Sequence, residues 1–406
     1  MLKNKNILIS GASIAGPTLA YWLKRFGFNP TVVERSPVLR EGGQPVDVRG
    51  EAVKIAKEMG IWPRLQREKT TLNEIAFLNE HRRVGKINLH ALRTFFKLDQ
   101  SWVEIMRGDL AKVLYALTRD EVEYRFGDSI QALEQDEEGV DVTFASGESR
   151  RFDLVVGADG LHSIVRTLAF GQEELFERYC GYYVGLFTTD NYLGLADSAL
   201  WFYSVPGKQT VIRRLKDSQR MGVCFIFKQP GKLTYDYHDL AQQKRLLSSH
   251  YADVGWEIPT FLQKMQAASD FYFDVVSQIR IEKWSQGRVV LVGDAAHCAA
   301  LLAGEGSKLA MMGGYILAGE LKAALGNHHS AFSNYERVFR PLVTAEQAKV
   351  KSSANYLVPE TARAIWEQNH LGPLILPFLM VPGGLWQEWF PKPSTLKNYA
   401  DSPLPA

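Results

Sequence analysis

Three runs of apolar residues, each ending at a glycine, are the strongest hydrophobic pattern in the chain. They comprise residues 7–10 before Gly11, residues 154–156 before Gly157 and residues 289–292 before Gly293. Short continuous apolar runs are typical of strands that are buried on both faces of a parallel sheet. A glycine at the end of each run predicts a tight turn. We therefore expect three buried parallel strands that end in glycine turns.

The segment after the first run predicts a βαβ unit. Leu19, Trp22, Leu23 and Phe26 recur at the i, i+3, i+4, i+7 spacing of an amphipathic helix. Residues 31–34 then form a second strand-like run, Thr-Val-Val-Glu. A strand, a helix and a parallel strand in this order begin a doubly wound sheet.

The middle and the end of the chain have different patterns. Residues 199–203 and 223–227 are aromatic and alternating, which favours antiparallel strands. Residues 315–325 and 331–339 favour helices, and we expect the second to stop at Pro341. The predicted fold is α/β: a doubly wound, Rossmann-type nucleotide-binding domain, an inserted mixed or antiparallel sheet as the substrate domain, and a C-terminal helical region. Clefts between such domains commonly bind small ligands.

Composition and charge narrow the class of partner. The chain has 406 residues, of which 46% are hydrophobic and 23% charged, as is usual for a folded protein with a large core. Lys and Arg number 47 against 45 Asp and Glu, a formal charge of +2. Such a balance gives no broad field for nucleic acid or acidic lipid. We expect small molecules as partners, and no nucleic acid.

Cysteine and histidine usage argues against disulfide and metal sites. Cys180, Cys224 and Cys298 are far apart and form no C-x-x-C pair. The nine histidines show no metal-ligand spacing. No apolar signal-peptide segment precedes the first strand. We expect a cytoplasmic protein, a monomer or weak dimer, that holds no metal.

One charge-free segment, residues 371–386, tests the expectation that the chain has no membrane span. A spanning helix needs about 20 apolar residues, and this segment is shorter. Pro373, Pro377 and Pro382 would also interrupt it. We expect it to pack against the body of the protein. A surface that touches a membrane or a partner is the alternative.

The first glycine turn has the pattern of a dinucleotide-binding loop. Residues 11–16 are Gly-Ala-Ser-Ile-Ala-Gly, a G-x-G-x-x-G fingerprint with Ser13 in place of the second glycine. Gly11 permits the sharp turn, Gly16 lets the helix pack close to the strand, and the first helical N–H groups would face a pyrophosphate. Glu34 ends the next strand, where it can accept hydrogen bonds from ribose hydroxyls. The alternative is a turn with no chemical role.

The other two glycine turns carry acids as well. Residues 153–166 are DLVVGADGLHSIVR, residues 293–297 are GDAAH, and residues 303–306 are AGEG. Together with the first turn they resemble, in this order, the dinucleotide fingerprint, the D-G motif and the G-D motif of the FAD-dependent aromatic hydroxylases, also called class A flavoprotein monooxygenases. The resemblance spans the chain up to about Pro341.

Within that family the chain is most similar to the tetracycline-inactivating flavin monooxygenases and their relatives. This likeness rests on GGQPVDVRG at residues 42–50, MRGDL at 106–110 and YILAGEL at 315–321. The resemblance also implies a division into domains. The FAD-binding domain would take residues 1–72, 104–176 and 283–325, the substrate domain residues 73–103 and 177–282, and the C-terminal helical region residues 326–406.

The resemblance implies that FAD is the cofactor. Asp294 would bond its ribityl chain, and Asp47 and Arg107 would also contact it. Gly304 and Gly306 would bring backbone N–H groups to the N1–C2=O edge of the flavin, which becomes anionic on reduction. The full expected set is Gly11, Ser13, Ile14, Ala15, Gly16, Glu34, Arg35, Arg40, Gln44, Asp47, Arg107, Asp159, Gly160, Asp294, Ala303, Gly304, Gly306 and Lys308.

Several residues leave alternatives open. Asp159 would serve both FAD and the nicotinamide nucleotide, or could merely cap the helix that begins near His162. Leu301 and Lys308 stand where the family usually has proline and asparagine. A lysine in a first helical turn needs a negative neighbour, so we expect Lys308 near the reduced flavin or a bound acidic group, or else exposed. We expect His297 to be structural and not an acid–base group.

The resemblance also implies a reaction. NADPH or NADH would bind transiently and reduce the flavin, O2 would add at C4a, and the hydroperoxyflavin would hydroxylate an aromatic or polycyclic phenolic or enolic molecule. Tetracycline-like compounds are the leading substrate hypothesis, which would make the enzyme one of antibiotic resistance. Arg213 would suit an enolate or phenolate. The candidate substrate contacts are Tyr203, Arg213, Phe225 and Leu302.

Two other functions remain open at this point. One is a flavin oxidase, dehydrogenase or halogenase on the same fold, although residues 256–259 (Trp-Glu-Ile-Pro) lack the W-x-W-x-I-P pattern of the halogenases. The other is a flavin-binding sensor that keeps the cofactor without turnover. The altered positions Leu301 and Lys308 keep that second alternative open.

Overall fold

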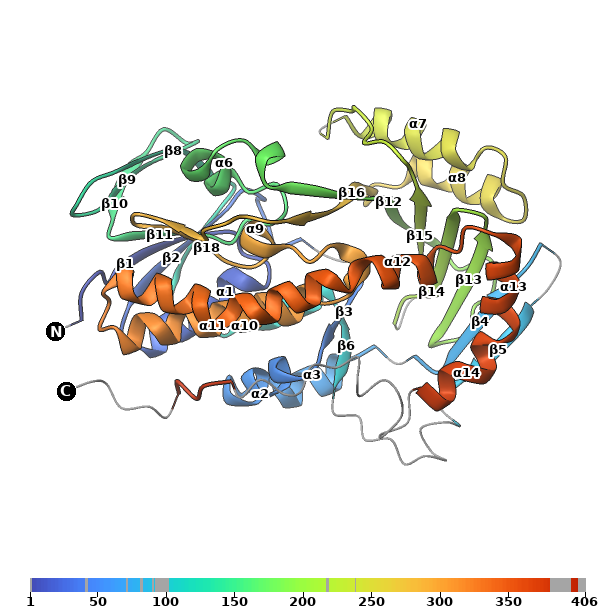
Figure 1. The fold of residues 1–406 in the computed structure, drawn as a ribbon, viewed down its shortest axis with the longest axis horizontal. Coiled ribbons are helices and arrows are strands. Elements are labelled where there is room, and N and C mark those ends of the chain that lie inside the picture. The colour runs from blue at the N-terminus through green and yellow to red at the C-terminus, as the bar shows by residue number, and fades with distance from the viewer. Residues whose placement is uncertain are drawn as a thin grey trace.

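A parallel sheet forms one half of the protein. The computed structural model in Figure 1 describes residues 2–40, 43–70, 72–80, 83–89, 91, 102–216, 219–237, 239–379 and 396–400, with the backbone alone for 376–379. The sheet has the order β17-β18-β11-β1-β2-β7. Its strands are β1 (Asn6–Ser10), β2 (Asn29–Glu34), β7 (Glu123–Phe126), β11 (Leu154–Gly157), β17 (Ser285–Gln286) and β18 (Val289–Leu291). All pairs are parallel except β17 with β18. The three predicted buried strands are confirmed as β1, β11 and β18.

Different layers cover the two faces of this sheet (Figure 1). On one side lie α1 (Ala15–Arg25), α10 (Gly306–Ala323) and α11 (His328–Ala348), with α10 packed between the other two. On the other side lie a three-stranded antiparallel sheet and a short helix. These are β8 (Ile130–Gln135), β9 (Val140–Phe144), β10 (Ser149–Phe152) and α6 (Ile164–Phe170). Burial on both faces explains the unbroken apolar runs in the strands.

A mixed sheet forms the other half, with the order β16-β12-β15-β14-β13-β4-β5. Its strands are β4 (Glu74–Leu78), β5 (Arg83–Asn88), β12 (Glu177–Asp190), β13 (Ala199–Val205), β14 (Lys208–Arg214), β15 (Arg220–Lys228) and β16 (Tyr272–Ile279). Only the β13–β4 pair is parallel. Helices α7 (Leu240–Tyr251) and α8 (Ile258–Ala267) cover one face, as Figure 1 shows at the upper right.

Smaller elements connect the two sheets. They are β3 (Pro45–Val48), β6 (Val103–Met106), α2 (Glu51–Glu58), α3 (Trp62–Glu68), α5 (Arg107–Ala116), α9 (Asp294–His297) and the 3-10 turns η1 (Glu173–Leu175) and η2 (Leu301–Ala303). Strands β3 and β6 pair with each other and lie between the two halves in Figure 1. The predicted arrangement of a doubly wound sheet, an inserted mixed sheet and C-terminal helices is confirmed.

The prediction that a helix stops at Pro341 is wrong. Helix α11 continues through this proline to Ala348. Proline removes one backbone hydrogen bond, but the helix packs on α10 and buries residues on both sides of the proline, including Phe339 and Val343. Arg340 also donates to the carbonyls of Ile281 and Glu282. Tertiary packing therefore outweighs the local penalty.

The C-terminal helices α12 (Val350–Leu357), α13 (Ala362–His370) and α14 (Gly372–Leu379) follow α11. The junction of α13 and α14 approaches β5 closely, because a Cβ at Gly85 would lie 2.1 Å from the carbonyl oxygen of Asn369. The first part of the charge-free segment therefore packs against the mixed sheet, although Leu374 and Ile375 are exposed. Residues 380–386 of that segment lie outside the described residues. In the described part of the chain, no helix is long and apolar enough to cross a membrane.

Candidate cofactor and active site

The three predicted glycine turns meet at one edge of the parallel sheet. Strand β11 pairs with β1 on one side and with β18 on the other, and all three strands run in parallel. Their carboxyl ends therefore open at the same edge. We call residues 11–16, 158–160 and 293–294 at this place the glycine edge. Ligands of doubly wound sheets bind at the carboxyl ends of the strands.

Close backbone packing explains two of the glycines. Gly11 has a φ of +109°, and a Cβ there would lie 2.4 Å from the carbonyl oxygen of Ala158. A Cβ at Gly16 would lie 1.9 Å from the carbonyl oxygen of Gly11. Neither position accepts a side chain without a shift of the backbone. The turn therefore brings the start of α1 directly against the end of β1, as the fingerprint predicts.

Two helices begin at this edge with uncapped N-termini. Among the described residues, no side chain caps α1 at Ile14 or α10 at Glu305, and neither helix has an acid in its first turn. A Cβ at Gly306, the first residue of α10, would lie 4.0 Å from the Asp294 carboxylate, so the α10 terminus adjoins the glycine edge. Free N–H groups and the positive end of the helix dipole favour anions. These termini fit the pyrophosphate and the anionic ring edge of FAD.

Three acids lie among these turns. Asp294 is accessible to solvent, yet the surrounding protein raises the pKa of its carboxyl by burial, against the opposing effect of Arg107. Burial also raises the pKa of Asp159, which accepts hydrogen bonds from Ser163 Oγ at 2.5 Å and Val165 N at 3.2 Å. Glu34 accepts from Ala12 N at 2.9 Å and Ser36 N at 3.0 Å. An accessible acid deep in the protein is a natural acceptor for sugar hydroxyls.

The Asp159 contact with Val165 N also bears on the alternative of a helix cap. Val165 is in the first turn of α6, whose N-cap residue is Ser163. Asp159 thus supports the start of this helix, as that alternative expects. Gly160 has a φ of +87°, and no atom would touch a Cβ there. The space beside Asp159 remains open for the cofactor role that the resemblance implies.

Basic side chains gather beside the first turn. Arg107 Nη2 donates to Ser13 Oγ at 3.1 Å, and its backbone N–H donates to the carbonyl oxygen of Gln44. Burial lowers the pKa of Arg40, and the nearby charges of Arg35 and Arg107 lower it further. Three arginines close to one uncapped helix N-terminus produce a positive field of the kind that holds a diphosphate. The structure thus brings Ser13, Arg35, Arg40, Gln44 and Arg107 together.

A cluster of paired charges, Arg49, Glu305, Lys308, Glu346 and Lys349, fixes the loop that leads into α10; we call it the ion cluster. Arg49 Nη2 lies 2.5 Å from Glu305 and 3.3 Å from the carbonyl oxygen of Gly304. Lys308 Nζ lies 2.6 Å from Glu305 and 2.8 Å from Glu346. Lys349 lies 2.7 Å from the other oxygen of Glu346. The loop after Ala300 is therefore held by ion pairs that involve Arg49, directly after β3, and residues of α10 and α11.

The structure gives Lys308 two negative neighbours, and its position near the reduced flavin stays a prediction. A negative neighbour is present, but Glu305 and Glu346 of the protein supply it, and no bound acid is required. The Lys308 side chain is only 11% exposed, so the exposed alternative is also wrong. Glu346 is fully buried, and its two lysines hold its pKa below the usual range in spite of burial. Sequence reasoning missed Glu346 and Arg49, because nothing local links them to residue 308.

A second polar group lies where β3 and β6 meet the mixed sheet. Asp47 and Glu104 are register partners. Arg213 Nη2 pairs with Glu104 and donates to Thr70 Oγ1 at 3.1 Å. Burial raises the pKa of Asp47 to about 6, with Arg49 opposing and Glu104 adding to the rise. Arg213 is therefore a paired cation and not an isolated one, and Glu104 is a residue that the sequence did not single out.

The structure places three of the four expected substrate contacts in apolar clusters. Tyr203 and Phe225 both align with Thr210 and face α7 and α8, where they are buried in the core. Period-two alternation sends Arg213 to the opposite face. Leu302 is buried among Val184, Val276 and residues of α12. Residue type alone suggests that an aromatic side chain can contact a flat substrate, whereas the strand register decides which face of the sheet it occupies.

His297 is a core residue, as expected. Its ring packs against Trp284, Tyr335 and Phe339. Burial lowers its pKa to about 3, so the ring is neutral. No acid–base role follows from this position.

Comparison with known proteins adds independent findings. A family model described as "FAD binding domain" matches residues 4–346. A flavin-dependent monooxygenase of Legionella longbeachae is 38% identical over 374 residues, which cover 91% of this chain and 94% of the relative. The crystal structure of tetracycline destructase Tet(55) superposes with a TM-score of 0.81 at 34% identity, covering 95% of this chain and 99% of that one. HpxO of Klebsiella pneumoniae complexed with FAD and uric acid shares the fold, with a TM-score of 0.66 at 23% identity over 91% of this chain and 92% of that one.

Proposed function

The chain belongs to the family of FAD-binding, flavin-dependent monooxygenases, and from this premise we propose that it hydroxylates a polycyclic phenol or enol of the tetracycline type, with NADPH or NADH as electron donor. The family membership confirms the predicted resemblance, the FAD cofactor and the monooxygenase activity. It favours this activity over the oxidase, dehydrogenase, halogenase and sensor alternatives. The substrate class and the electron donor are the parts that we propose.

The residues of the glycine edge fit FAD in named roles. Bound FAD, once reduced, supplies the activation of O2 and the transfer of one oxygen atom. The N-terminus of α1 and Arg107 would hold the pyrophosphate, Glu34 the ribose and Asp294 the ribityl hydroxyls. The N-terminus of α10 would donate N–H groups to the pyrimidine edge of the ring.

The protein would orient the substrate and exclude water. None of its side chains would need to attack the substrate. The face of the mixed sheet opposite α7 and α8 carries Arg213, paired with Glu104 and close to Asp47. Hydrogen-bonding groups of both signs suit a flat molecule with several oxygen atoms better than a simple anion. A held substrate close to the ring reacts before oxygen is lost as peroxide.

One observation carries the substrate proposal: 34% identity to tetracycline destructase Tet(55) over 95% of this chain, with a TM-score of 0.81. That protein is named for its own substrate. At this level of identity the shape of the substrate face is expected to be similar, whereas single contacts differ. We therefore propose the class of compound and not one compound.

The proposal is tested with the purified FAD-loaded protein, NADPH or NADH, and a panel of tetracyclines and other polycyclic phenols. The expected result is a product heavier by one oxygen atom, derived from ¹⁸O-labelled O2, and substrate-stimulated oxidation of the nicotinamide. Controls omit oxygen or use simple monocyclic phenols. Oxidation of the nicotinamide that no polycyclic compound stimulates, with all oxygen recovered as peroxide, would refute the proposed substrate class.

A further inference from the structure

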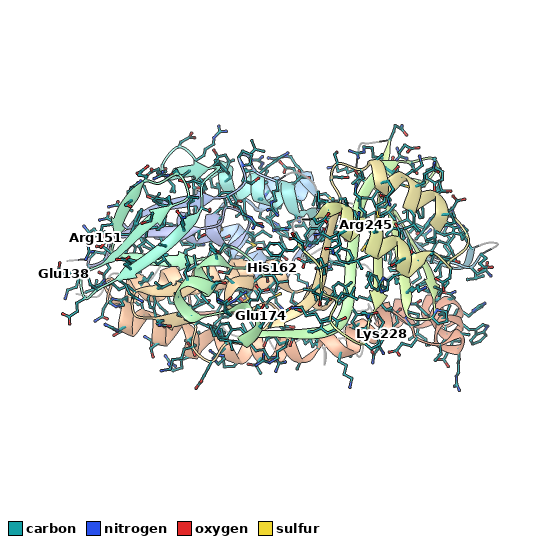
Figure 2. The ribbon with its side chains drawn as sticks, turned by 90° about the horizontal axis from the view of Figure 1, so that it is seen from above. Glu138, Arg151, His162, Glu174, Lys228 and Arg245 are labelled. Carbon is teal, nitrogen blue, oxygen red and sulfur yellow. The ribbon has the colours of Figure 1, made fainter. Side chains whose placement is uncertain are left out.

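A chain of ionisable groups that the function above does not use runs across the junction of the two halves. Tyr272 Oη donates to Asp274 Oδ2 at 2.6 Å, and Asp274 Oδ1 lies 3.1 Å from His162 Nε2. His162 Nδ1 lies 2.8 Å from Glu173 Oε1. The four side chains come from β16, the segment before α6, and η1. Figure 2 shows His162 at the junction between the half with β8–β10 and the half with α7 and α8.

One end of this chain faces the cofactor side of the mixed sheet. Phe273 and Val275 pack in the core under α7 and α8, so Tyr272 and Asp274 point to the opposite face. On that face Val184, the register partner of Asp274, packs with Ala300 of the loop before α10. Tyr272 is 38% exposed, and the charges of Arg107 and Arg40 are close enough to interact with its hydroxyl. Its hydroxyl therefore lies beside the residues expected to hold FAD.

The other end reaches solvent. The His162 side chain is 30% exposed and Glu173 is 21% exposed, whereas Asp274 between them and Tyr272 is 11% exposed. Arg166, fully buried, fixes Glu173 at 2.6 Å and also donates to the carbonyl oxygen of Ala295 in α9. Three hydrogen bonds thus link His162 and Glu173 to Tyr272 on the cofactor side of the mixed sheet.

The protonation state of His162 suits a proton carrier. Burial lowers its pKa, but the hydrogen bonds to Asp274 and Glu173 outweigh this and raise the pKa to about 10. The ring is then an imidazolium that donates from both nitrogens. Other charged or titratable groups around the path are Tyr237 stacked on the ring, Arg166, Glu177, Lys232, Tyr183 and Tyr235, together with Arg40 and Arg107 near Tyr272.

A monooxygenase needs a supply of protons. The balanced reaction is RH + O2 + 2 electrons + 2 protons, giving ROH and H2O. A hydride donor delivers both electrons with one proton, so at least one further proton has to come from solvent. A closed site that excludes water cannot take it from bulk solution directly.

We propose that Glu173, His162, Asp274 and Tyr272 form a path that carries a proton from solvent to the cofactor side of the mixed sheet. Tyr272 releases its hydroxyl proton toward the reacting oxygen and takes one from Asp274. His162 Nε2 supplies that proton to the Asp274 carboxylate. The ring, now neutral, keeps its Nδ1 proton on Glu173, which holds it in place, and regains the lost proton at Nε2 from water. Each group ends as it began, and one proton has moved inward. Tyr272 is the catalytic member; the others act through it.

The test needs no organic substrate, because dissolved O2 is the probe. Enzyme reduced anaerobically is mixed with O2 in weakly buffered solution with a pH indicator dye. Return of the anionic reduced flavin to its oxidised form with release of H2O2 takes up one proton. We expect Tyr272→Phe and Asp274→Asn to slow this uptake by about 100-fold above pH 8, since general acid catalysis contributes on that scale. Added imidazole is expected to restore much of the rate in Tyr272→Phe, measured there by the absorbance of the returning oxidised flavin, because imidazole buffers the solution against the dye.

Two controls separate this path from a general loss of structure. Tyr179→Phe removes a hydroxyl that only bonds the carbonyl oxygen of Gln229, and His250→Gln removes a ring bonded to the carbonyl oxygen of Leu246. Both are expected to take up protons at the normal rate. FAD affinity, measured by flavin fluorescence, is expected to be equal in all variants.

A second measurement follows His162 without turnover. In the ¹⁵N NMR spectrum of the oxidised protein, the His162 ring is expected to stay protonated above pH 8 and to titrate at lower pH in Asp274→Asn. Normal proton uptake in both Tyr272→Phe and Asp274→Asn would overturn the proposal. Slow uptake that imidazole does not restore, together with weakened FAD binding, would also overturn it, because the residues would then be structural. Since O2 alone is used, a failed search for the organic substrate leaves this test unaffected.

Discussion

The glycine edge and the ion cluster are adjacent, yet they differ in whether their charged and polar groups have partners within the protein. In the glycine edge, no side chain among the described residues caps the N-terminus of α1, and Asp294 is exposed to solvent. In the ion cluster, Glu346 is fully buried and meets two lysines, and Glu305 meets Lys308 and Arg49. Polar groups without a protein partner are costly unless a ligand completes them. The polar groups of the glycine edge are therefore expected to bind the cofactor, whereas those of the ion cluster stabilise the loop beside it.

The largest expected effect concerns the ion cluster. Lys308→Met leaves Glu346 buried with only one lysine, and breaking a buried ion pair costs about 3 kcal/mol or more. Urea unfolding of the FAD-free protein measures this loss, and Lys351→Met, at an exposed lysine, is the matched control. An unchanged midpoint in Lys308→Met would mean that the cluster does not stabilise the loop.

Gly16→Ala attacks the glycine edge by steric overlap. Its Cβ would lie 1.9 Å from a backbone oxygen, so the turn has to shift, at a cost of about 2–3 kcal/mol. We expect FAD to bind roughly 30- to 150-fold more weakly, as measured by flavin fluorescence. Gly231→Ala, which meets no atom within 4 Å, is the control. Equal affinity in the two variants would contradict the close approach at Gly16.

Unfolding at low pH tests a third residue, His297, which lies in the core near the glycine edge. Its folded pKa of about 3 lies below its ordinary value of 6.5, so the unfolded state binds the extra proton between these values. The associated stability is full above pH 6.5 and is lost as the pH falls toward 3, by roughly 2 kcal/mol at pH 5. His297→Gln is expected to lose less stability on acidification than the parent protein. The control, His370→Gln at an exposed helix end, should retain the parent's pH dependence.

Asp294→Asn tests whether the Asp294 carboxylate binds the cofactor or stabilises the protein. We expect FAD affinity to fall by about tenfold, or about 1.4 kcal/mol, because a charged acceptor becomes neutral. The FAD-free protein is expected to unfold at the same urea concentration or a higher one. The control is Asp141→Asn, which changes an acid of β9 that pairs with Arg151 of β10. This variant should bind FAD normally. A loss of stability without a loss of affinity would place Asp294 in the structural class.

The smallest expected effect is at Tyr203, whose hydroxyl is buried and has no hydrogen-bond partner among the described residues. Tyr203→Phe is expected to change the free energy of unfolding by less than about 1 kcal/mol and to leave kcat/KM unchanged. Arg213→Gln, on the opposite face, is expected to lower kcat/KM. Steady-state kinetics with an identified substrate compare the two. A large loss in Tyr203→Phe would restore that residue as a substrate contact.

Much of the fold followed from local pattern. The apolar runs at β1, β11 and β18 predicted buried parallel strands because only strands covered on both faces are apolar throughout. The helix through Pro341 was missed because its stabilisation comes from packing on α10. Local rules describe what a residue prefers, and a long packed helix can override one preference.

The sequence by itself determined the three glycine–acid turns, since each glycine and each acid is placed by its own strand. It also indicated that Lys308 needs a negative partner. Glu305, three positions before it, is one such partner. Tertiary structure alone decided that Glu346, 38 positions away, is the other. It alone set the register that turns Tyr203 and Phe225 away from Arg213, and it alone aligned Tyr272, Asp274 and His162. Turn chemistry is local, whereas charge pairing and strand register depend on segments that meet only after folding.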